Sequence, residues 1–313
     1  MPEPEIRPYR SEDAELAVPL FRTLIPDEIQ TGPAIDHWIA SQPARAGMRA
    51  WTALVDDEVV GWANARLRWS LEAGDVAGGW VGVLPAHRRS GLGSALYRLV
   101  EDHARALGAR RLTSFAMESD RDGPDFAARR GFREGRRDQS WELDVANAAL
   151  RRPAPPPEAK VVRLRSVRDR ERDLFELYDA AHGDMPGDDR STLEFDEWQP
   201  ETLGNPTLDL DVSAVVFVED RPAALAWVNS DRVGGVGVNE LTGTHPDFRR
   251  RGLARLAKEA SILWAAEAGI ATLFTANDTT NADMLALNEH LGYRPTHVQL
   301  ELTKVLDGRE SGP

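Results

Sequence analysis

Hydrophobic and polar positions form two successive series along the chain, and both series predict the same order of elements. That order is a strand, two helices, a hairpin, a strand, a helix, a strand, a short helix and a closing strand. The first series is expected at residues 5–9, 11–24, 35–39, 50–67, 80–84, 91–107, 111–117, 125–130 and 139–143. The second is expected at residues 161–165, 168–181, 193–198, 212–229, 237–242, 252–268, 272–276, 282–290 and 297–303. Strands mixed with helices in this order predict an α/β fold with a mixed sheet in each half.

A proline-rich segment separates the two series. Residues 153–157 contain four prolines, and such a run favours extended polyproline geometry. We therefore predict an N-terminal domain over residues 1–150, a linker over 151–160 and a C-terminal domain over 161–305. The length of 313 residues agrees with two domains.

One motif occurs in both series, at the turn between a strand rich in small residues and the long helix that follows. Residues 88–93 read Arg-Arg-Ser-Gly-Leu-Gly, and residues 249–254 read Arg-Arg-Arg-Gly-Leu-Ala. The copies are 161 positions apart (249 − 88), and this spacing holds over roughly 50 positions. Upstream, Trp-Ala-Asn at 62–64 matches Trp-Val-Asn at 227–229 at a spacing of 165, which predicts a loop of different length. The pattern indicates one duplicated unit.

The composition of this turn predicts a phosphate-binding site. A helix that begins at a turn leaves backbone N–H groups free, and glycine lets a ligand come close to them. Neither copy has the Gly-Lys-Ser/Thr of a nucleotide-binding Walker loop. A dinucleotide fingerprint needs a third glycine where the chain has Leu96 and Ala257. What remains is Arg-x-x-Gly-x-Gly/Ala.

This turn, present twice, resembles that of the GNAT acyltransferase family, in which it holds the pyrophosphate of acetyl-CoA. The order of elements in each half also resembles one GNAT domain. The resemblance covers nearly the whole chain apart from the linker and the tail after Lys304. It implies two tandem GNAT-like acyl-CoA N-acyltransferase domains, similar in size and layout to mycothiol synthase, with acetyl-CoA as the acyl donor.

The resemblance also implies where acetyl-CoA binds, along the strand before each turn and on the turn itself. In the first half the implied residues are Val81, Val83, Arg88, Arg89, Ser90, Gly91, Leu92 and Gly93. In the second half they are Leu241, Thr242, Thr244, Arg249, Arg250, Arg251, Gly252, Leu253 and Ala254. Asn281 begins a later helix, where the resemblance implies a contact with pantetheine and the local pattern predicts an N-cap. These two roles are compatible.

Acyl transfer to an amine needs a neutral amine, a stabilised oxyanion and a proton for the leaving thiolate. Several GNAT enzymes carry a base at the position of Glu240, and the alternative is a glutamate that simply faces solvent. The first half has Gly79 at the same spacing. Many GNAT enzymes also have a tyrosine acid where this chain has Ala127 and Asn288, a departure that leaves the acid unassigned.

Charge and composition narrow the classes of partner. The net charge of −13 disfavours nucleic acid, and the scattered arginine pairs at 88–89, 129–130, 136–137 and 151–152 are interpreted mostly as solvated faces. The chain has no cysteine, and its histidines lack the spacing of metal ligands, so we expect no metal site. We see neither a signal peptide nor a membrane span, and expect a cytoplasmic protein.

We interpret the chain as an acetyl-CoA-dependent N-acetyltransferase that acts on a small-molecule amine by direct attack. Chemistry is expected mainly in the C-terminal half, because Gly79 cannot take a proton and Asp120 stands at the place of Asn281. Gly123 and Pro124 should also delay and shorten the helix of the first half. The alternatives are a non-catalytic CoA-binding or regulatory protein and a protein N-acetyltransferase that holds a peptide.

Overall fold

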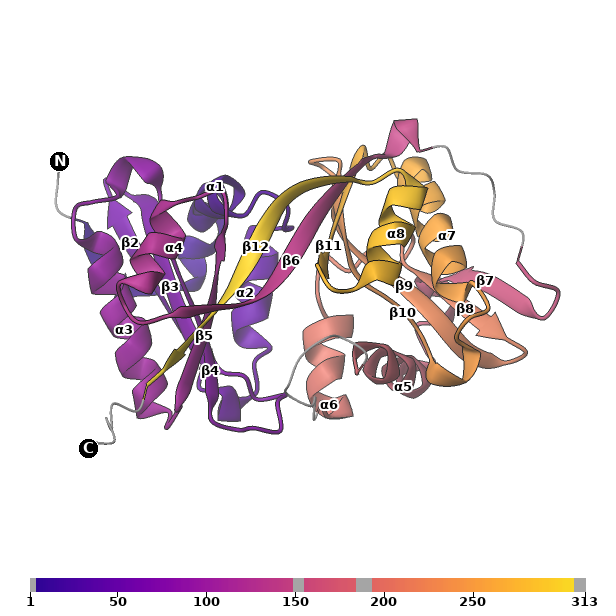
Figure 1. Cartoon of the computed structure of the whole chain (residues 1–313), viewed down its shortest axis with the longest axis horizontal. Helices are drawn as coiled ribbons and strands as arrows, with labels where there is room; N and C mark the ends of the chain where they lie inside the picture. The colour runs from indigo at the N-terminus through magenta and orange to yellow at the C-terminus, as the bar shows by residue number, and fades with distance from the viewer. Residues whose placement is uncertain (1–3, 149–154, 184–192, 307–313) are drawn as a thin grey trace. The chain divides into compact units, whose positions relative to one another are not determined.

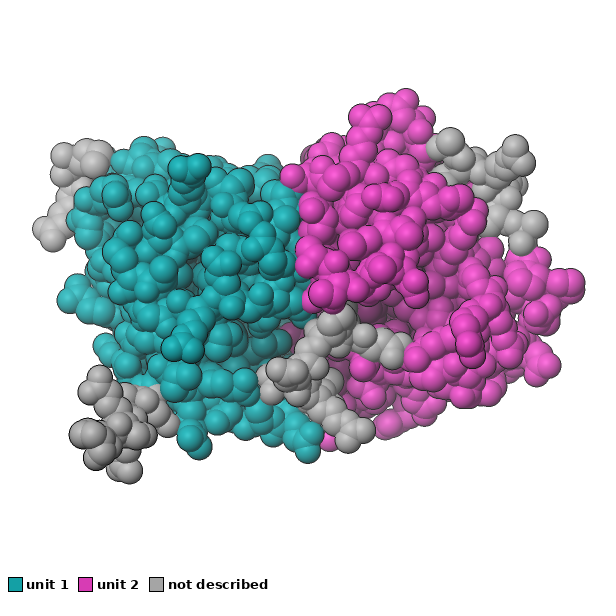
Figure 2. All heavy atoms as spheres, viewed as in Figure 1, with its two compact units in different colours: residues 1–26, 30–138, 297–313 teal, residues 27–29, 139–296 magenta. Residues whose placement is uncertain are grey.

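The computed structural model describes residues 4–148, 155–183 and 193–306, and the chain divides into two compact units (Figure 2). Unit 1 comprises Met1–Pro26, Gln30–Asp138 and His297–Pro313, and unit 2 comprises Asp27–Ile29 and Gln139–Thr296. Each unit is a mixed α/β unit, which confirms the predicted fold class.

Unit 1 contains a sheet with helices on both faces (Figure 1). Its strands lie in the order β1 (Glu5–Pro8), β2 (Arg49–Val55), β3 (Glu58–Leu67), β4 (Val76–Val83), β5 (Arg111–Met117) and β12 (Arg294–Val305). Its helices are α1 (Ala14–Leu24), α2 (Gly32–Ala40), α3 (Leu92–Ala106) and α4 (Asp122–Ala128). One core lies under α3 around Leu96 and Leu112, and a second lies under α1 around Phe21 and Trp62.

Unit 2 repeats this plan. Its strands lie in the order β6 (Arg133–Asp144), β11 (Thr272–Asp278), β10 (Val236–Thr244), β9 (Arg221–Asp231), β8 (Ala214–Val218) and β7 (Ala159–Arg163). Its helices are α5 (Glu171–His182), α6 (Phe195–Trp198), α7 (Leu253–Glu267) and α8 (Ala282–Leu291). Helices α7 and α8 cover cores around Leu256 and Leu273, and α5 and α6 cover a core around Trp198 and Trp227.

The closing strands are exchanged between the halves of the sequence. Residues 299–305 of β12 pair antiparallel with β5, and Leu300 and Leu302 are buried in the core of unit 1. Trp141 and Leu143, in the second part of β6, are buried in the core of unit 2. The predicted contiguous division therefore does not coincide with the compact units at residues 139–150 and 297–305. Of the predicted linker, residues 151–154 lie outside the described chain, and Ala159 and Lys160 belong to β7.

Several boundaries differ from the prediction. β4 begins at Val76 rather than at residue 80, and β6 begins at Arg133 rather than at residue 139. The helix expected at residues 125–130 is α4, which begins at Asp122, because proline is tolerated in the first turn of a helix. It spans 7 residues against 10 for α8, so the predicted shortening is confirmed.

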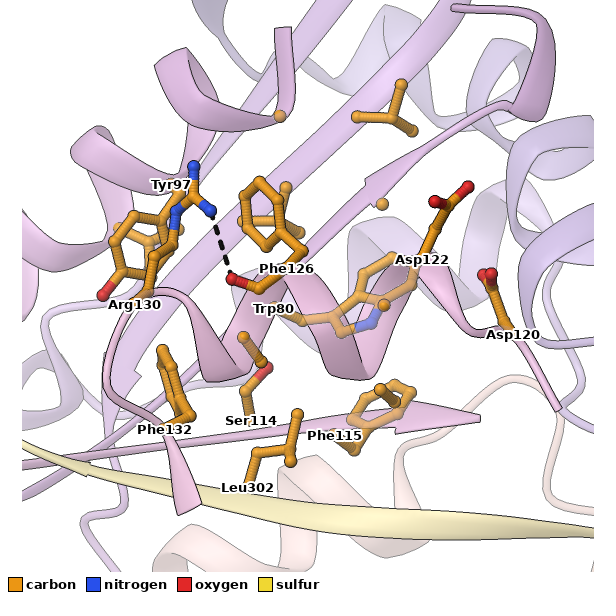
Figure 3. A pocket seen from close by; sticks show the side chains of 18 of the residues that line it. Trp80, Tyr97, Ser114, Phe115, Asp120, Asp122, Phe126, Arg130, Phe132 and Leu302 are labelled. Atoms are coloured by element: carbon orange, nitrogen blue, oxygen red, sulfur yellow. Dashed lines mark hydrogen bonds between the residues drawn. The ribbon is translucent and has the colours of Figure 1, made fainter. Parts of the chain in front are cut away.

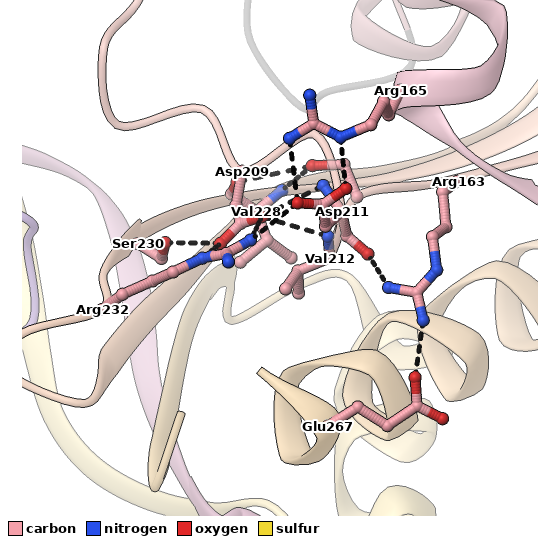
Figure 4. Close-up of polar contacts among 10 residues, drawn as sticks. Arg163, Arg165, Asp209, Asp211, Val212, Val228, Ser230, Arg232 and Glu267 are labelled. Atoms are coloured by element: carbon pink, nitrogen blue, oxygen red, sulfur yellow. Dashed lines mark hydrogen bonds and ion pairs between the residues drawn. The ribbon is translucent and has the colours of Figure 1, made fainter. Parts of the chain in front are cut away.

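A polar network fixes one end of the strands of unit 2 (Figure 4). Arg232 binds both carboxylate oxygens of Asp209, at 2.8 and 2.6 Å, and Asp209 also accepts from Ser230 at 2.7 Å. Burial alone would raise the pKa of Asp209, but these hydrogen bonds outweigh it and the pKa is lowered. Arg165 pairs with Asp211 beside it. Because the charged side chains of this network form hydrogen bonds and ion pairs with one another, we assign the network a structural role.

Candidate functional site

In each unit, two parallel strands separate after a short pairing. β4 and β5 pair only through residues 76–78 and 111–113, and β10 and β11 pair only through residues 236–238 and 272–274. Beyond these residues the facing backbone groups of the two strands are not paired with each other. Both units therefore open a gap between strands at the place where the resemblance implies that pantetheine and the thioester bind.

The turn after each gap has the same unusual backbone in both units. φ is 61° at Arg89 and 90° at Gly91, and it is 60° at Arg250 and 73° at Gly252. A positive φ is strained for arginine and is typical of functional turns. The backbone N–H groups of residues 89–93 and 250–254 donate to no acceptor among the described residues. Such a row of free N–H groups at a helix N-terminus is suited to a pyrophosphate.

Unit 1 contains a cavity of about 480 Å³ between the β4–β5 gap, the turn and α4 (Figure 3). Its walls combine aromatic rings with charged groups. Among the lining residues are Trp80, Tyr97, Phe115, Phe126, Arg88, Asp120, Ser114 and Arg130. A cavity with a phosphate-binding turn at one end and apolar walls at the other is suited to an acyl-CoA.

Arg88 does not stand free at this cavity. Its Nη1 and Nη2 lie 3.0 and 2.9 Å from the two carboxylate oxygens of Asp120, and its Nε donates to the carbonyl of Val83 at 3.0 Å. The negative charge expected at Asp120 is therefore held by the arginine that was predicted to bind phosphate. A phosphate at this turn would compete with Asp120 for Arg88.

Arg130 is a further cation at the cavity beside Arg88 and Arg89, and the sequence pattern did not reveal it. Its Cζ lies 3.4 Å from the centroid of the Phe126 ring, and its Nη2 donates to Ser94 Oγ at 2.6 Å. Burial lowers the pKa of this guanidinium, which remains positive. The scattered arginine pairs predict mostly solvated faces, but Arg130 lies against the cavity, where its charge favours an anion.

Aromatic rings span the gap of unit 1 on the side of α1. Trp80 stacks on Phe21, with ring centroids 5.8 Å apart, and on Phe115 of β5, with centroids 5.5 Å apart. A Cβ at Gly82 would come within 2.5 Å of the Trp80 ring, so glycine is required there. A Cβ at Gly79 would lie 2.6 Å from Val100, which leaves no room for an acidic side chain. This part of unit 1 therefore offers no base.

Glu240 is the extra residue of a β-bulge. Asn239 and Leu241 pair with successive residues of β9, Val228 and Trp227, and Glu240 stands between them. Its side chain reaches solvent and accepts from Asn229 Nδ2 at 3.1 Å. The surrounding protein still desolvates the carboxylate, and this raises its pKa. A carboxylate with a raised pKa is a stronger base than an ordinary one.

The bulge changes how the two units correspond. Gly78 pairs with Thr113, and Val238 pairs with Phe274, so Val238 corresponds to Gly78 at a spacing of 160 (238 − 78). The spacing of 161 resumes only after the bulge. Glu240 is therefore an insertion, and its predicted correspondence with Gly79 is wrong. The match of residues 62–64 with 227–229 is also out of register, because Trp62 faces Gly82 and Trp227 faces Leu241.

The remaining predicted residues differ in what they can present to a ligand. Arg249, Arg250, Arg251 and Gly252 are exposed on the turn. Leu92, Leu241 and Leu253 are buried in the cores, so only their backbone could reach a cofactor. Ser90 Oγ donates to His87 O, and Thr242 Oγ1 donates to Asn239 Oδ1. Val81 and Gly93 line the unit 1 cavity with Val83 and Arg89, whereas Thr244 and Ala254 are partly exposed in unit 2.

The predicted N-cap at Asn281 is confirmed. Its Oδ1 accepts from the backbone N–H of Met284 at 3.3 Å, at the start of α8. Contact with pantetheine remains a prediction. In the described part of the chain no helix is long and apolar enough to cross a membrane, and no three His, Asp or Glu side chains gather as metal ligands.

Comparison with known proteins identifies the family. The model of the Acetyltransferase (GNAT) family matches residues 15–132 and 172–293, one region in each half of the sequence. These regions cover more than half of the chain. The protein therefore belongs to the acetyltransferase (GNAT) family, with two such regions in tandem.

Solved structures share the tandem fold. A GCN5-related N-acetyltransferase from Sphaerobacter thermophilus has a TM-score of 0.72 and 16% identity, covering 98% of this chain and 97% of that one. A tandem GNAT protein from the clavulanic acid biosynthesis pathway has a TM-score of 0.75 and 17% identity, covering 98% of this chain and 100% of that one. A putative acetyltransferase from Pyrococcus horikoshii has a TM-score of 0.59 and 16% identity, covering 96% and 89%. At these identities the similarity shows the fold alone. No curated protein matches the sequence.

Proposed function

We propose that this protein transfers an acetyl group from acetyl-CoA to the amine of a small molecule, with chemistry in unit 2. The observation that carries the proposal is the row of free backbone N–H groups at residues 89–93 and 250–254, each at the end of a strand gap. Bound acetyl-CoA would supply an activated acyl thioester. The residues of the chain supply the binding, orientation and proton transfer.

In unit 2, Glu240 is the proposed general base. It lies on the bulge beside the gap, and Asn229 orients its carboxylate. An amine is a cation at neutral pH, and it becomes nucleophilic only after it loses a proton. Glu240 would accept that proton, and backbone N–H groups of β10 beyond the bulge would bind the carbonyl oxygen. No residue of this site is proposed to carry the acyl group covalently.

Unit 1 is proposed to bind the cofactor without catalysing transfer. Its cavity has the phosphate-binding turn, but Arg88 is engaged with Asp120 and the rings of Trp80 and Phe115 span the gap. Unit 1 has no counterpart of Glu240, because Glu240 is inserted at the bulge of β10. The alternative hypothesis is that the protein binds CoA without catalysing a reaction. Only the features of unit 1 support this alternative.

The test is release of CoA from acetyl-CoA with a library of amines. Gly91→Val and Gly252→Val each place a β-branched residue at a positive φ and disturb one turn. The Gly252→Val protein should lose turnover, and the Gly91→Val protein should retain most of it. Full activity of Gly252→Val together with an inactive Gly91→Val would refute the assignment of chemistry to unit 2.

A further inference from the structure

The interior of unit 2 holds a lysine with no carboxylate beside it. Lys258 of α7 is 0% exposed, and its Nζ donates to Asn288 Oδ1 of α8 at 2.7 Å. The ring of Tyr293 lies 4.9 Å from Nζ. Among the described residues Lys258 forms no ion pair, and burial lowers its pKa to about 7. A buried cation without a counter-ion costs stability, so its presence calls for a functional reason.

The duplication places this lysine on the path of the cofactor. Lys258, Asn277 and Asn288 correspond, at the spacing of 161, to Tyr97, Ala116 and Ala127 of unit 1. All three of these counterparts line the unit 1 cavity. Where unit 1 has a cavity wall, unit 2 has three hydrogen-bonded polar side chains. The chain of Lys258, Asn288 and Asn277 therefore lies along the wall that a cofactor in unit 2 would follow.

The lysine sets the direction of every hydrogen bond in this chain. Lys258 Nζ can donate both as an amine and as an ammonium group, and Asn288 turns its carbonyl oxygen toward it. Its amide nitrogen then faces Asn277 and donates to Asn277 Oδ1 at 2.7 Å. Asn277 is left with its amide N–H₂ as the free end, and no acceptor for it is present among the described residues. Because Asn277 is only partly buried, this donor can reach a ligand.

We propose that Lys258 and Asn288 hold Asn277 as the hydrogen-bond donor to the sulfur of CoA when the acyl group leaves in unit 2. This inference rests on the proposed function. As the amine nitrogen bonds to the acyl carbon, the carbon–sulfur bond breaks and its electron pair passes to sulfur. The Asn277 N–H stabilises the thiolate, which then takes a proton from solvent.

The hydrogen-bonded series of Lys258, Asn288 and Asn277 thus takes the place of the tyrosine acid of other GNAT enzymes, whose position is occupied here by Asn288. Asn277 touches the reacting sulfur and is the catalytic residue. Lys258 acts through Asn288 and is a positioning residue, because its hydrogen bond orients both amides so that an N–H of Asn277 is left for the sulfur.

CoA alone tests the proposal, because the acceptor amine is not needed. The protein carries Gly91→Val, so that only the turn of unit 2 takes CoA, and binding is followed by calorimetry. The pKa of the bound thiol is then read from the ultraviolet absorbance of the thiolate as the pH is raised. A free thiol has a pKa of about 8.5. We expect the pKa of the bound CoA thiol to be lower by roughly one unit or more, which is a tenfold change in the ionisation equilibrium.

Two variants separate this role from a merely structural one. Lys258→Met removes the hydrogen-bond donor that orients Asn288 and Asn277, so the pKa of the bound CoA thiol should return to its free value. Asn277→Asp keeps the shape but brings a negative charge to the sulfur, so the thiol should ionise less readily than free CoA. If Lys258→Met does not fold, Asn277→Asp decides alone.

The outcomes distinguish the inference from the function on which it rests. Bound CoA with the same thiol pKa in the Gly91→Val protein and in both variants overturns the inference. A Gly91→Val protein that binds no CoA instead counts against the proposed function of unit 2.

Discussion

Replacing Lys258 by methionine should change how the stability of unit 2 depends on pH. Burial lowers the pKa of Lys258 from 10.5 to about 7, which corresponds to roughly 5 kcal/mol at about 1.36 kcal/mol per tenfold step. Below about pH 7, Lys258 is protonated in both the folded and the unfolded state. The folded protein is then destabilised by the full free energy of burying the charged ammonium group. Between about pH 7 and 10.5 the unfolded chain binds a proton that the folded chain lacks, so stability rises with pH.

The assay is urea unfolding at pH 7 and pH 9, followed by tryptophan fluorescence. With these pKa values, Lys258 should make the folded protein more stable at pH 9 than at pH 7 by roughly 2 kcal/mol. Lys258→Met should lack this gain and should be the more stable protein at pH 7. An identical pH dependence in the wild type and in Lys258→Met would refute the reasoning.

Lys304→Met is the matched control. Lys304 Nζ lies 2.6 Å from Glu101 Oε1, and this hydrogen bond outweighs burial, so the pKa of Lys304 is raised. A lysine whose pKa is raised on folding stabilises the folded protein at pH values below its pKa in the unfolded chain. This stabilisation is lost as the pH rises through its pKa in the folded protein. Lys304→Met should therefore be less stable at neutral pH and should keep the gain that Lys258 provides.

Three further substitutions test the cofactor turns and the base. Arg249→Ala should weaken CoA binding roughly ten- to a hundredfold in calorimetry, because a charge-assisted contact contributes about 1.5–3 kcal/mol; unchanged affinity would mean that Arg249 is only a solvated helix start. Glu240→Gln should lower turnover on the order of a hundredfold with little change in acetyl-CoA affinity, whereas full activity would exclude it as the base. Asp120→Asn should remove the closer of the two carboxylates at Arg88, leaving Asp122 at 3.6 Å, and raise the CoA affinity of unit 1 roughly tenfold in the Gly252→Val protein; an unchanged affinity would show that Asp120 does not compete.

The order of elements and both turns could be predicted from the sequence because their signals are local. Strand β5 begins and ends at the predicted residues, and α8 is capped by Asn281 as expected. Glycine at positions 91 and 252 permits the positive φ found there, whereas nothing in the sequence indicated the positive φ of Arg89 and Arg250. Each of these features depends on residues within a few positions of one another.

Features that depend on pairing between distant segments could not be predicted in the same way. The alternation of the closing strands identifies them as strands, but it does not say which sheet β6 or β12 joins. Likewise, the sequence does not reveal that Glu240 is the extra residue of a β-bulge, because the bulge is defined by the pairing of Asn239 and Leu241 with β9. Lys258 was missed because a lysine on a helix is usually exposed, although its spacing from Tyr97 offered a signal.

In the proposed function, one duplicated plan separates cofactor binding from chemistry through few residues. Unit 1 keeps small residues at Gly79, Ala116 and Ala127, and a cavity with room for a ligand lies beside them. Unit 2 inserts Glu240 and fills the corresponding wall with polar groups whose direction Lys258 sets. A base and a thiolate donor are useful only on opposite sides of one acyl carbon, since one accepts the proton of the amine and the other stabilises the leaving sulfur. Unit 2 has a candidate for each role beside the gap between β10 and β11, whereas unit 1 has no counterpart of the inserted Glu240 and has Ala116 in place of Asn277. In the proposed function the two differences act together, because each supplies one of the two proton-handling groups that acyl transfer in unit 2 would need.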